Sequence, residues 1–117
     1  MEIRRGDIYI VDFDPNKGAD TKVGSEILKK RPAVVLTRNA INNARKTVVV
    51  VPLSSSPRAA PPLVVAVPSA GDQSVAVCDQ ITAVNKATRL GRHVGKLAAN
   101  DLLAIEEAVR EVLGLDT

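Results

Sequence analysis

Three polar side chains at the edges of apolar segments have the chemistry to act on a phosphodiester. Glu26 and Arg31 stand near the end of a long polar segment, and Ser54 directly follows the apolar run Val48–Leu53. Arg31 carries a planar, permanently charged fork of donors that suits the oxygens of a phosphate in a transition state. Ser54 can donate a hydroxyl to the same phosphate, and Glu26 can orient Arg31 or act on a proton. Such a set suits cleavage of RNA by its own 2′-hydroxyl, because the substrate then supplies the nucleophile.

The same residues also allow a purely structural interpretation. Arg31 can be a surface charge at the start of a strand, paired with Glu26, and Ser54 can be the first residue of a Ser/Pro turn. Glu26 can be a solvated carboxylate. Residue type and spacing leave both interpretations open, because loop positions are only enriched in functional residues.

Several other catalytic chemistries lack the residues they need. The single histidine, His93, and the single cysteine, Cys78, cannot form a zinc site of the Cys/His type. One imidazole also cannot provide the acid and base of a two-histidine ribonuclease, and we interpret His93 as a surface or turn residue. A phosphate-binding loop ending in Lys-Ser or Lys-Thr and a Gly-x-Ser-x-Gly elbow are both absent from the sequence. We therefore expect no metal and no other cofactor.

Positive charge is concentrated in the first half of the chain. Residues 1–60 contain 11 Lys and Arg against 6 Asp and Glu, whereas residues 61–117 contain 5 against 7. This asymmetry favours an anionic partner such as nucleic acid, although ordinary surface charge explains the same counts. Tyr9 and Phe13 are the only aromatic residues. A platform on which bases stack is therefore not expected.

Length and composition predict a single domain, residues 1–117, large enough to bury one core. One cysteine excludes an intrachain disulfide and suits a reducing cytoplasm. No apolar stretch is long enough to cross a membrane. We expect a cytoplasmic protein that does not associate with the membrane.

Short apolar runs separated by Pro and Gly predict a small β-barrel or rolled sheet. Four consecutive valines, Val48–Val51, give the strongest strand signal. The unbroken apolar run after Pro32 predicts a strand that is buried on both faces. The expected strands cover residues 8–13, 32–37, 46–53 and 63–67, with one or two more inside 74–84; residues 14–31 and 54–62 are expected loops, and 39–43 a turn or short helix.

The C-terminal segment changes to a helical period. The apolar residues follow one another at spacings of three, four and three, which predicts one stripe of an amphipathic helix: Leu102, Ile105, Val109 and Val112. We expect Asn100 to be its N-cap, with Asp101 in the first turn, and Gly114 to end it. The predicted class is mainly β with helices, α+β.

An ordered set of motifs resembles the MazF/PemK family of toxins, which are sequence-specific endoribonucleases that cut messenger RNA. The motifs are Arg5-Gly6-Asp7-Ile8, Val11-Asp12-Phe13-Asp14-Pro15, Gly24-Ser25-Glu26, Arg31-Pro32-Ala33-Val34-Val35, Val51-Pro52-Leu53 and Cys78-Asp79-Gln80-Ile81, followed by the closing helix. Each motif is weak alone, but the ordered set is specific and covers nearly the whole chain. The resemblance implies a small SH3-like β-barrel of the CcdB/PemK type with a C-terminal helix.

The resemblance also implies roles for individual residues. Arg31 and Ser54 map to the catalytic pair of the family, Glu26 to the Glu of Gly-Ser-Glu, and Gln80 to an RNA-binding position. The implied reaction is metal-independent cleavage of single-stranded mRNA that leaves 2′,3′-cyclic phosphate and 5′-hydroxyl ends. The implied assembly is a homodimer that binds RNA along its interface. A MazE-like antitoxin with an acidic segment would cover the same groove, and the antitoxin complex would bind DNA.

The loop before Arg31 departs from the family pattern because it is longer, with Ala19–Val23 as the extra piece. We expect this loop to be mobile and to close over RNA, with Lys17, Lys29 and Lys30 contacting phosphates. Two further departures are Ile10, where many relatives have Trp, and Ser54 in place of the commoner Thr.

Two alternatives remain at this stage. The same barrel resembles CcdB-type toxins, which bind DNA gyrase and catalyse nothing. A catalytically inactive nucleic-acid-binding barrel is the second. The pair of Arg31 and Ser54 separates these alternatives from a ribonuclease, because a protein that only binds gyrase does not need it.

Overall fold

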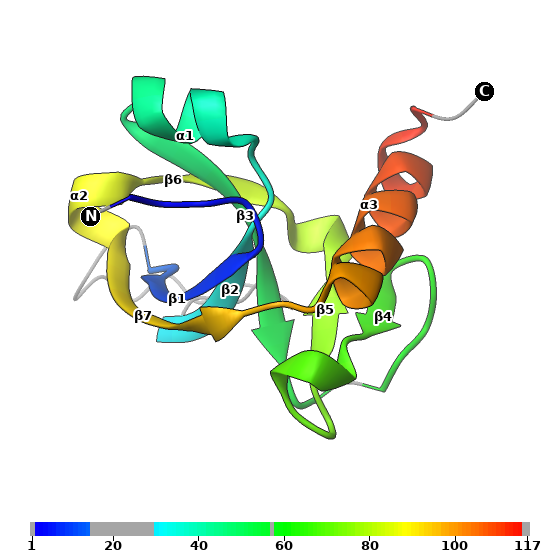
Figure 1. Cartoon of the computed structure of the whole chain (residues 1–117). Helices are drawn as coiled ribbons and strands as arrows, with labels where there is room; N and C mark the ends of the chain where they lie inside the picture. The colour runs from blue at the N-terminus through cyan, green and yellow to red at the C-terminus, as the bar shows by residue number, and fades with distance from the viewer. Residues whose placement is uncertain (1, 15–29, 57, 116–117) are drawn as a thin grey trace.

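The computed structural model of the chain describes residues 2–14, 30–56 and 58–115. Within this part, seven strands form one antiparallel sheet, and three helices and two 3₁₀ turns connect or cover them (Figure 1). The elements are β1 (Asp7–Asp12), β2 (Lys30–Val35), α1 (Asn39–Ala44), β3 (Thr47–Ser54), β4 (Val64–Ala66), η1 (Pro68–Ala70), β5 (Val75–Val77), η2 (Cys78–Gln80), β6 (Thr82–Asn85), α2 (Lys86–Arg89), β7 (Leu90–Lys96) and α3 (Ala99–Leu113). The predicted α+β class is confirmed.

The strands follow the order β4-β5-β3-β2-β1-β7, and β6 pairs with the first half of β3. The long strand β3 therefore belongs to two parts of the sheet, which curve away from each other. Figure 1 shows α3 beside β4 and β5, whereas α1 lies at the opposite end of β3. β2 and β3 occupy the centre of the sheet and position everything that follows.

Two apolar clusters cover the two faces of β2, as the unbroken apolar run predicts. Ala33, Val34 and Val35 are all completely buried. Val34 packs into the cluster under α3, together with Ile105 and Val109, whereas Ala33 and Val35 pack into the cluster that contains Tyr9 and Val11. Since successive side chains of a strand point to opposite faces, this burial fixes the register of β2.

The C-terminal helix agrees with the predicted stripe but not with its predicted N-cap. Ile105 and Val109 are buried and Leu102 and Val112 are partly buried against the same cluster. The N-cap is Ala98, which makes no side-chain cap bond, so the prediction for Asn100 is wrong. The carboxylate of Asp101 instead accepts hydrogen bonds from the backbone and hydroxyl of Ser69, which fastens the helix start to η1. At the other end Gly114 ends the helix, as predicted, and it adopts a left-handed conformation with φ of 68°.

Two elements were not predicted: α2 and the edge strand β7. The sequence of β7, Leu-Gly-Arg-His-Val-Gly-Lys, contains two glycines and no alternating apolar residues, so it lacks the usual strand signals. It becomes a strand because its backbone pairs with β1, with register shifts on the way. His93 is exposed, as predicted, but it belongs to this strand rather than to a turn.

In the part of the chain that the structure describes, no helix is long and apolar enough to cross a membrane.

The attachment of α3 to the sheet gives a direct test of this packing. Replacing the fully buried Ile105 by Ala should lower the free energy of unfolding by about 2–5 kcal/mol, because it removes apolar contacts and leaves a cavity. On the same helix, Leu103 is 53% exposed, and Leu103→Ala should change the stability by less than about 0.5 kcal/mol. Urea denaturation of both variants measures the difference, and equal effects would contradict the assignment of the buried face.

Candidate active site

The pairing of β2 with β3 brings Arg31 and Ser54 together. Ala33 pairs with Pro52, Val34 with Val51 and Val35 with Val50. Continuing this register by two residues places Arg31 opposite Ser54. Both residues line one pocket of about 410 Å³. Two side chains that are 23 positions apart in the sequence therefore share a single site.

The rest of the pocket combines apolar side chains, hydroxyl groups and one further cation. Its lining includes Ile8, Pro32, Leu53, Ser55, Ser74 and Lys96. Lys96 comes from the end of β7, and Ser74 from the segment that leads into β5. A phosphate at Arg31 would thus have a second positive charge nearby and apolar surface beside it. The sequence analysis missed Lys96, because it did not predict the strand that carries it.

Arg31 has an unpaired donor in the folded protein. Its side chain is half-buried, and its Nε atom is buried without any hydrogen-bond partner among the described residues. A buried N–H without an acceptor costs stability, and such groups in native proteins are rare. The Nε atom is closed to solvent, whereas the Arg31 side chain as a whole is half-buried and lines the pocket, so an anionic ligand would meet the guanidinium there. This observation favours the functional interpretation of Arg31 over a surface charge paired within the protein.

The position of Ser54 agrees with both the structural and the functional interpretation of this residue. Its hydroxyl donates a hydrogen bond to the backbone carbonyl of Ser56 and accepts one, 3.3 Å long, from the Ser56 backbone N–H. Ser54 is therefore a turn residue at the end of β3, as the structural interpretation has it. The same hydroxyl lines the Arg31 pocket and can be redirected to a phosphate by rotation about one side-chain bond.

The other predicted site residues do not join this pocket. Lys30 is exposed and lines a separate pocket on β2 and β7. Gln80 is half-buried at the end of η2 and is not among the residues that line the Arg31 pocket. Glu26, Lys17 and Lys29 lie outside the described residues, as does the loop that we expect to close over RNA.

The remaining reactive side chains do not take part in the pocket. Cys78 is completely buried, and burial together with the nearby Asp79 charge raises the pKa of its thiol to about 11. Its thiolate is thus scarce at neutral pH, which disfavours a nucleophilic role. His93 Nε2 lies 3.5 Å from the Asp7 carboxylate, and its ring meets the edge of Tyr9. Burial, followed by the Asp7 charge, raises the pKa of the Tyr9 hydroxyl.

A family of known proteins matches nearly the whole chain. The model of the family described as PemK-like, MazF-like toxin of type II toxin–antitoxin systems matches residues 4–113. The endoribonuclease toxin MazF of Escherichia coli (strain K12) is 32% identical over 109 residues, which cover 93% of this chain and 92% of that protein. Endoribonuclease MazF9 of Mycobacterium tuberculosis is 30% identical over 122 residues, covering 97% and 98%.

Solved structures agree with the fold. MazF from Deinococcus radiodurans superposes with a TM-score of 0.81 at 22% identity, over 97% of this chain and 98% of that one. An endoribonuclease in complex with its cognate antitoxin, from a mycobacterial species, gives a TM-score of 0.74 at 22% identity and covers 97% of each chain. The predicted small barrel-like fold with a C-terminal helix is therefore confirmed.

The unpaired Nε of Arg31 predicts that this residue does not stabilise the fold. Arg31→Met keeps the aliphatic bulk and removes the unsatisfied donor, so the free energy of unfolding should stay within about 1 kcal/mol of the original or rise. Arg45→Met, at an exposed arginine next to α1, is the control. Urea denaturation compares the two. A loss of more than about 2 kcal/mol in Arg31→Met alone would mean that Arg31 is structural.

Proposed function

We propose that this chain, which belongs to the PemK- and MazF-like family of toxins of type II toxin–antitoxin systems, is an endoribonuclease toxin. The resemblance drawn from the sequence motifs is thus confirmed at the level of the family. The observation that carries the proposed activity is the joint pocket of Arg31 and Ser54, in which Arg31 holds a buried donor without an acceptor. Relatives that share about a third of their residues with the chain are named endoribonucleases.

The proposed substrate is single-stranded mRNA, and the nucleophile is the 2′-hydroxyl next to the cleaved bond. Its oxygen attacks the phosphorus and loses a proton, the bond from phosphorus to the 5′-oxygen breaks, and the leaving 5′-oxygen takes up a proton. The products carry a 2′,3′-cyclic phosphate and a 5′-hydroxyl. No metal ion enters this scheme, because the substrate supplies the nucleophile and protein donors stabilise the charge.

Each residue of the pair has a separate role in this scheme. The guanidinium of Arg31 donates to the phosphate oxygens, on which negative charge grows in the transition state. The hydroxyl of Ser54 turns from the Ser56 carbonyl to one of the same oxygens. Glu26, which the family motif assigns to the site, orients Arg31 or moves a proton.

The same proposal assigns partners and contacts. A homodimer binds RNA, with Lys17, Lys29, Lys30 and Gln80 as contact residues in addition to the catalytic pair. A MazE-like antitoxin with an acidic segment neutralises the toxin, as one of the solved structures contains an endoribonuclease with its cognate antitoxin, and the complex binds DNA. RNA as a substrate and an antitoxin as a partner both require a cytoplasmic location.

A CcdB-like protein that binds gyrase is the second candidate. Such a protein would need no arginine with a free donor beside a hydroxyl in a pocket. The Arg31–Ser54 pocket and the match to the PemK/MazF model both favour the ribonuclease.

The first prediction from this mechanism concerns metal ions and product ends. Purified protein incubated with a long single-stranded RNA in EDTA should cut it and leave 2′,3′-cyclic phosphate and 5′-hydroxyl ends. Primer extension maps the positions of cleavage. Resistance of the downstream product to ligation that requires a 5′-phosphate detects its 5′-hydroxyl. Cleavage that stops in EDTA and returns with magnesium would overturn the mechanism.

The second prediction concerns the catalytic pair. Arg31→Ala should lower the cleavage rate by at least about 100-fold, the usual loss for one preorganised donor. Arg31→Lys should also be poor, because a point charge cannot replace the planar fork. Ser54→Ala should be impaired, whereas Ser54→Thr should be active because it keeps the hydroxyl.

Single-turnover rates on one RNA measure these effects, and Arg45→Ala is the control for loss of a positive charge. Wild-type cleavage by Arg31→Ala would remove Arg31 from the mechanism. Activity of Ser54→Ala above that of Ser54→Thr would remove Ser54.

A further inference from the structure

A second pocket lies next to the Arg31–Ser54 pocket and is built from other elements. Its volume is about 310 Å³. The residues of its lining on which the argument depends are Ile10, Asp12, Lys30, Arg89, Gly91 and Arg92. They come from β1, β2, α2 and β7, so the pocket joins four segments of the chain.

The apolar residues between the two pockets lie on one face of the sheet. Ile10 and Pro32 are direct cross-strand partners; Ile10 lines the second pocket and Pro32 the first. Along β1, Ile8 lines the first pocket and Ile10 the second. Residues two apart point to the same face and are separated by about 7 Å along a strand. The Ile10–Pro32 pair is thus a narrow apolar ridge between the pockets.

Positive charge from three elements converges on the second pocket. Arg89 is fixed, because its Nη1 donates a 3.1 Å hydrogen bond to the backbone carbonyl of Asp12. Lys30 and Arg92 are exposed and make no hydrogen bond or ion pair with any described residue. Among the residues that the structure describes, one carboxylate, that of Asp12, lines the pocket together with these three cations. The pocket therefore keeps a net positive charge that an anion would neutralise.

The local backbone of β7 is shaped to form this pocket. Tyr9 pairs with His93 and Val11 pairs with Leu90, so β7 advances by three residues where β1 advances by two. Gly91 lies at this irregularity, and a Cβ atom there would be 3.1 Å from the carbonyl oxygen of Ile10. A larger residue would push β7 away from β1. Irregularities of this kind often reorient side chains next to functional sites.

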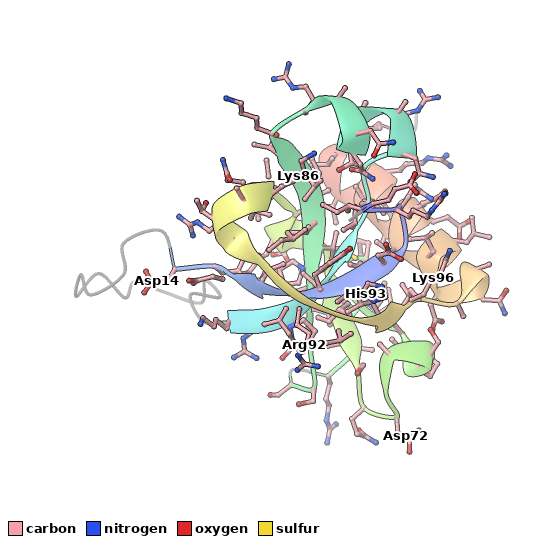
Figure 2. The ribbon with its side chains drawn as sticks, turned by 60° about the vertical axis from the view of Figure 1, so that its left-hand side comes forward. Asp14, Asp72, Lys86, Arg92, His93 and Lys96 are labelled. Carbon is pink, nitrogen blue, oxygen red and sulfur yellow. The ribbon has the colours of Figure 1, made fainter. Side chains whose placement is uncertain are left out.

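We propose that the second pocket binds a backbone phosphate of the same RNA strand whose cleaved phosphodiester lies at Arg31 and Ser54. This inference rests on the proposed function and names a further subsite for its substrate. Phosphate contacts of this kind set the position of a strand without reading its bases. Figure 2 shows Arg92 and Lys96 along β7; Arg92 lines the second pocket and Lys96 the first. The strand thus supplies one cation to each of two neighbouring phosphate sites.

A polyanion with evenly repeated charges fits this arrangement better than an acidic peptide does. Every nucleotide carries a phosphate, so a strand held at the first pocket has a further phosphate to place beyond the ridge. Lys and Arg contacts to phosphates release counterions, which makes affinity depend on salt. The salt dependence is therefore the property that identifies this subsite.

The test measures binding of a mixed-sequence, fully 2′-O-methylated RNA 12-mer, which cannot be cleaved by 2′-hydroxyl attack, over a range of KCl concentrations. Arg92→Ala and Lys30→Ala should each weaken binding about threefold to tenfold at low salt and reduce the slope of log affinity against log salt by about 0.7. Arg45→Ala and Lys46→Ala, at exposed cations beside α1, are the matched controls and should change neither quantity. Arg92→Lys should restore the slope, and the positions of cleavage in natural RNA should not change.

The outcomes separate this inference from the proposed function. If the wild-type protein cleaves RNA but Arg92→Ala binds with the affinity and slope of Arg45→Ala, the second phosphate site is wrong. If the wild-type protein does not cleave, yet the slope depends on Arg92, the phosphate site stands and the proposed activity is wrong. Arg92→Ala that binds RNA normally but loses affinity for poly-glutamate would assign the pocket to an acidic peptide and overturn the inference.

Discussion

The register of β2 between β1 and β3 is the constraint on which the site depends. Val34 packs into one apolar cluster and Ala33 and Val35 into the other, so a shift by one residue would exchange the side chains that the two clusters receive. That alignment puts Lys30 opposite Asp12 and brings Arg31 into the pocket that Ser54 also lines. The position of the proposed catalytic pair therefore depends on the packing of three apolar side chains that take no part in the proposed chemistry.

The strand β2 also carries polar groups that have no hydrogen-bond partner among the described residues. Arg31 Nε is buried without an acceptor in the described residues. Lys30 makes no hydrogen bond or ion pair with those residues, and it shares its pocket with two further cations, Arg89 and Arg92. Arg5, near the other end of β2, donates to the Leu36 carbonyl and to Glu106, and thereby joins α3 to the end of β2. The two ends of the strand thus differ, because one arginine links elements of the fold and the other keeps a buried donor without an acceptor in the described residues.

Local sequence signals predicted the central strands and the last helix, but they did not predict β7; the roles of Arg31 and Ser54 came from the family resemblance and stay predictions. The valines of β3 and the stripe through Ile105 are strong local patterns. β7 has no such pattern, because its strand form comes from pairing with β1, and Gly91 acquires its meaning only beside the Ile10 carbonyl. The sequence therefore shows that Lys96, Arg89 and Arg92 are basic, but it does not show which pocket each of them lines. The prediction of Asn100 as the N-cap also failed because a distant residue holds the start of the helix. The carboxylate of Asp101 accepts a hydrogen bond from the backbone of Ser69, which lies 32 residues earlier.

The scarcity of aromatic side chains determines how this surface can hold a nucleic acid. Tyr9 is buried at 1% exposure, and Phe13 is partly buried against the same core cluster. Ile10 and Pro32 form only an apolar ridge between the two pockets. Stacking would contribute about 1–3 kcal/mol per base and depends little on salt. Without stacking, attraction between phosphates and the cations of β2, α2 and β7 would supply most of the affinity for the proposed RNA substrate.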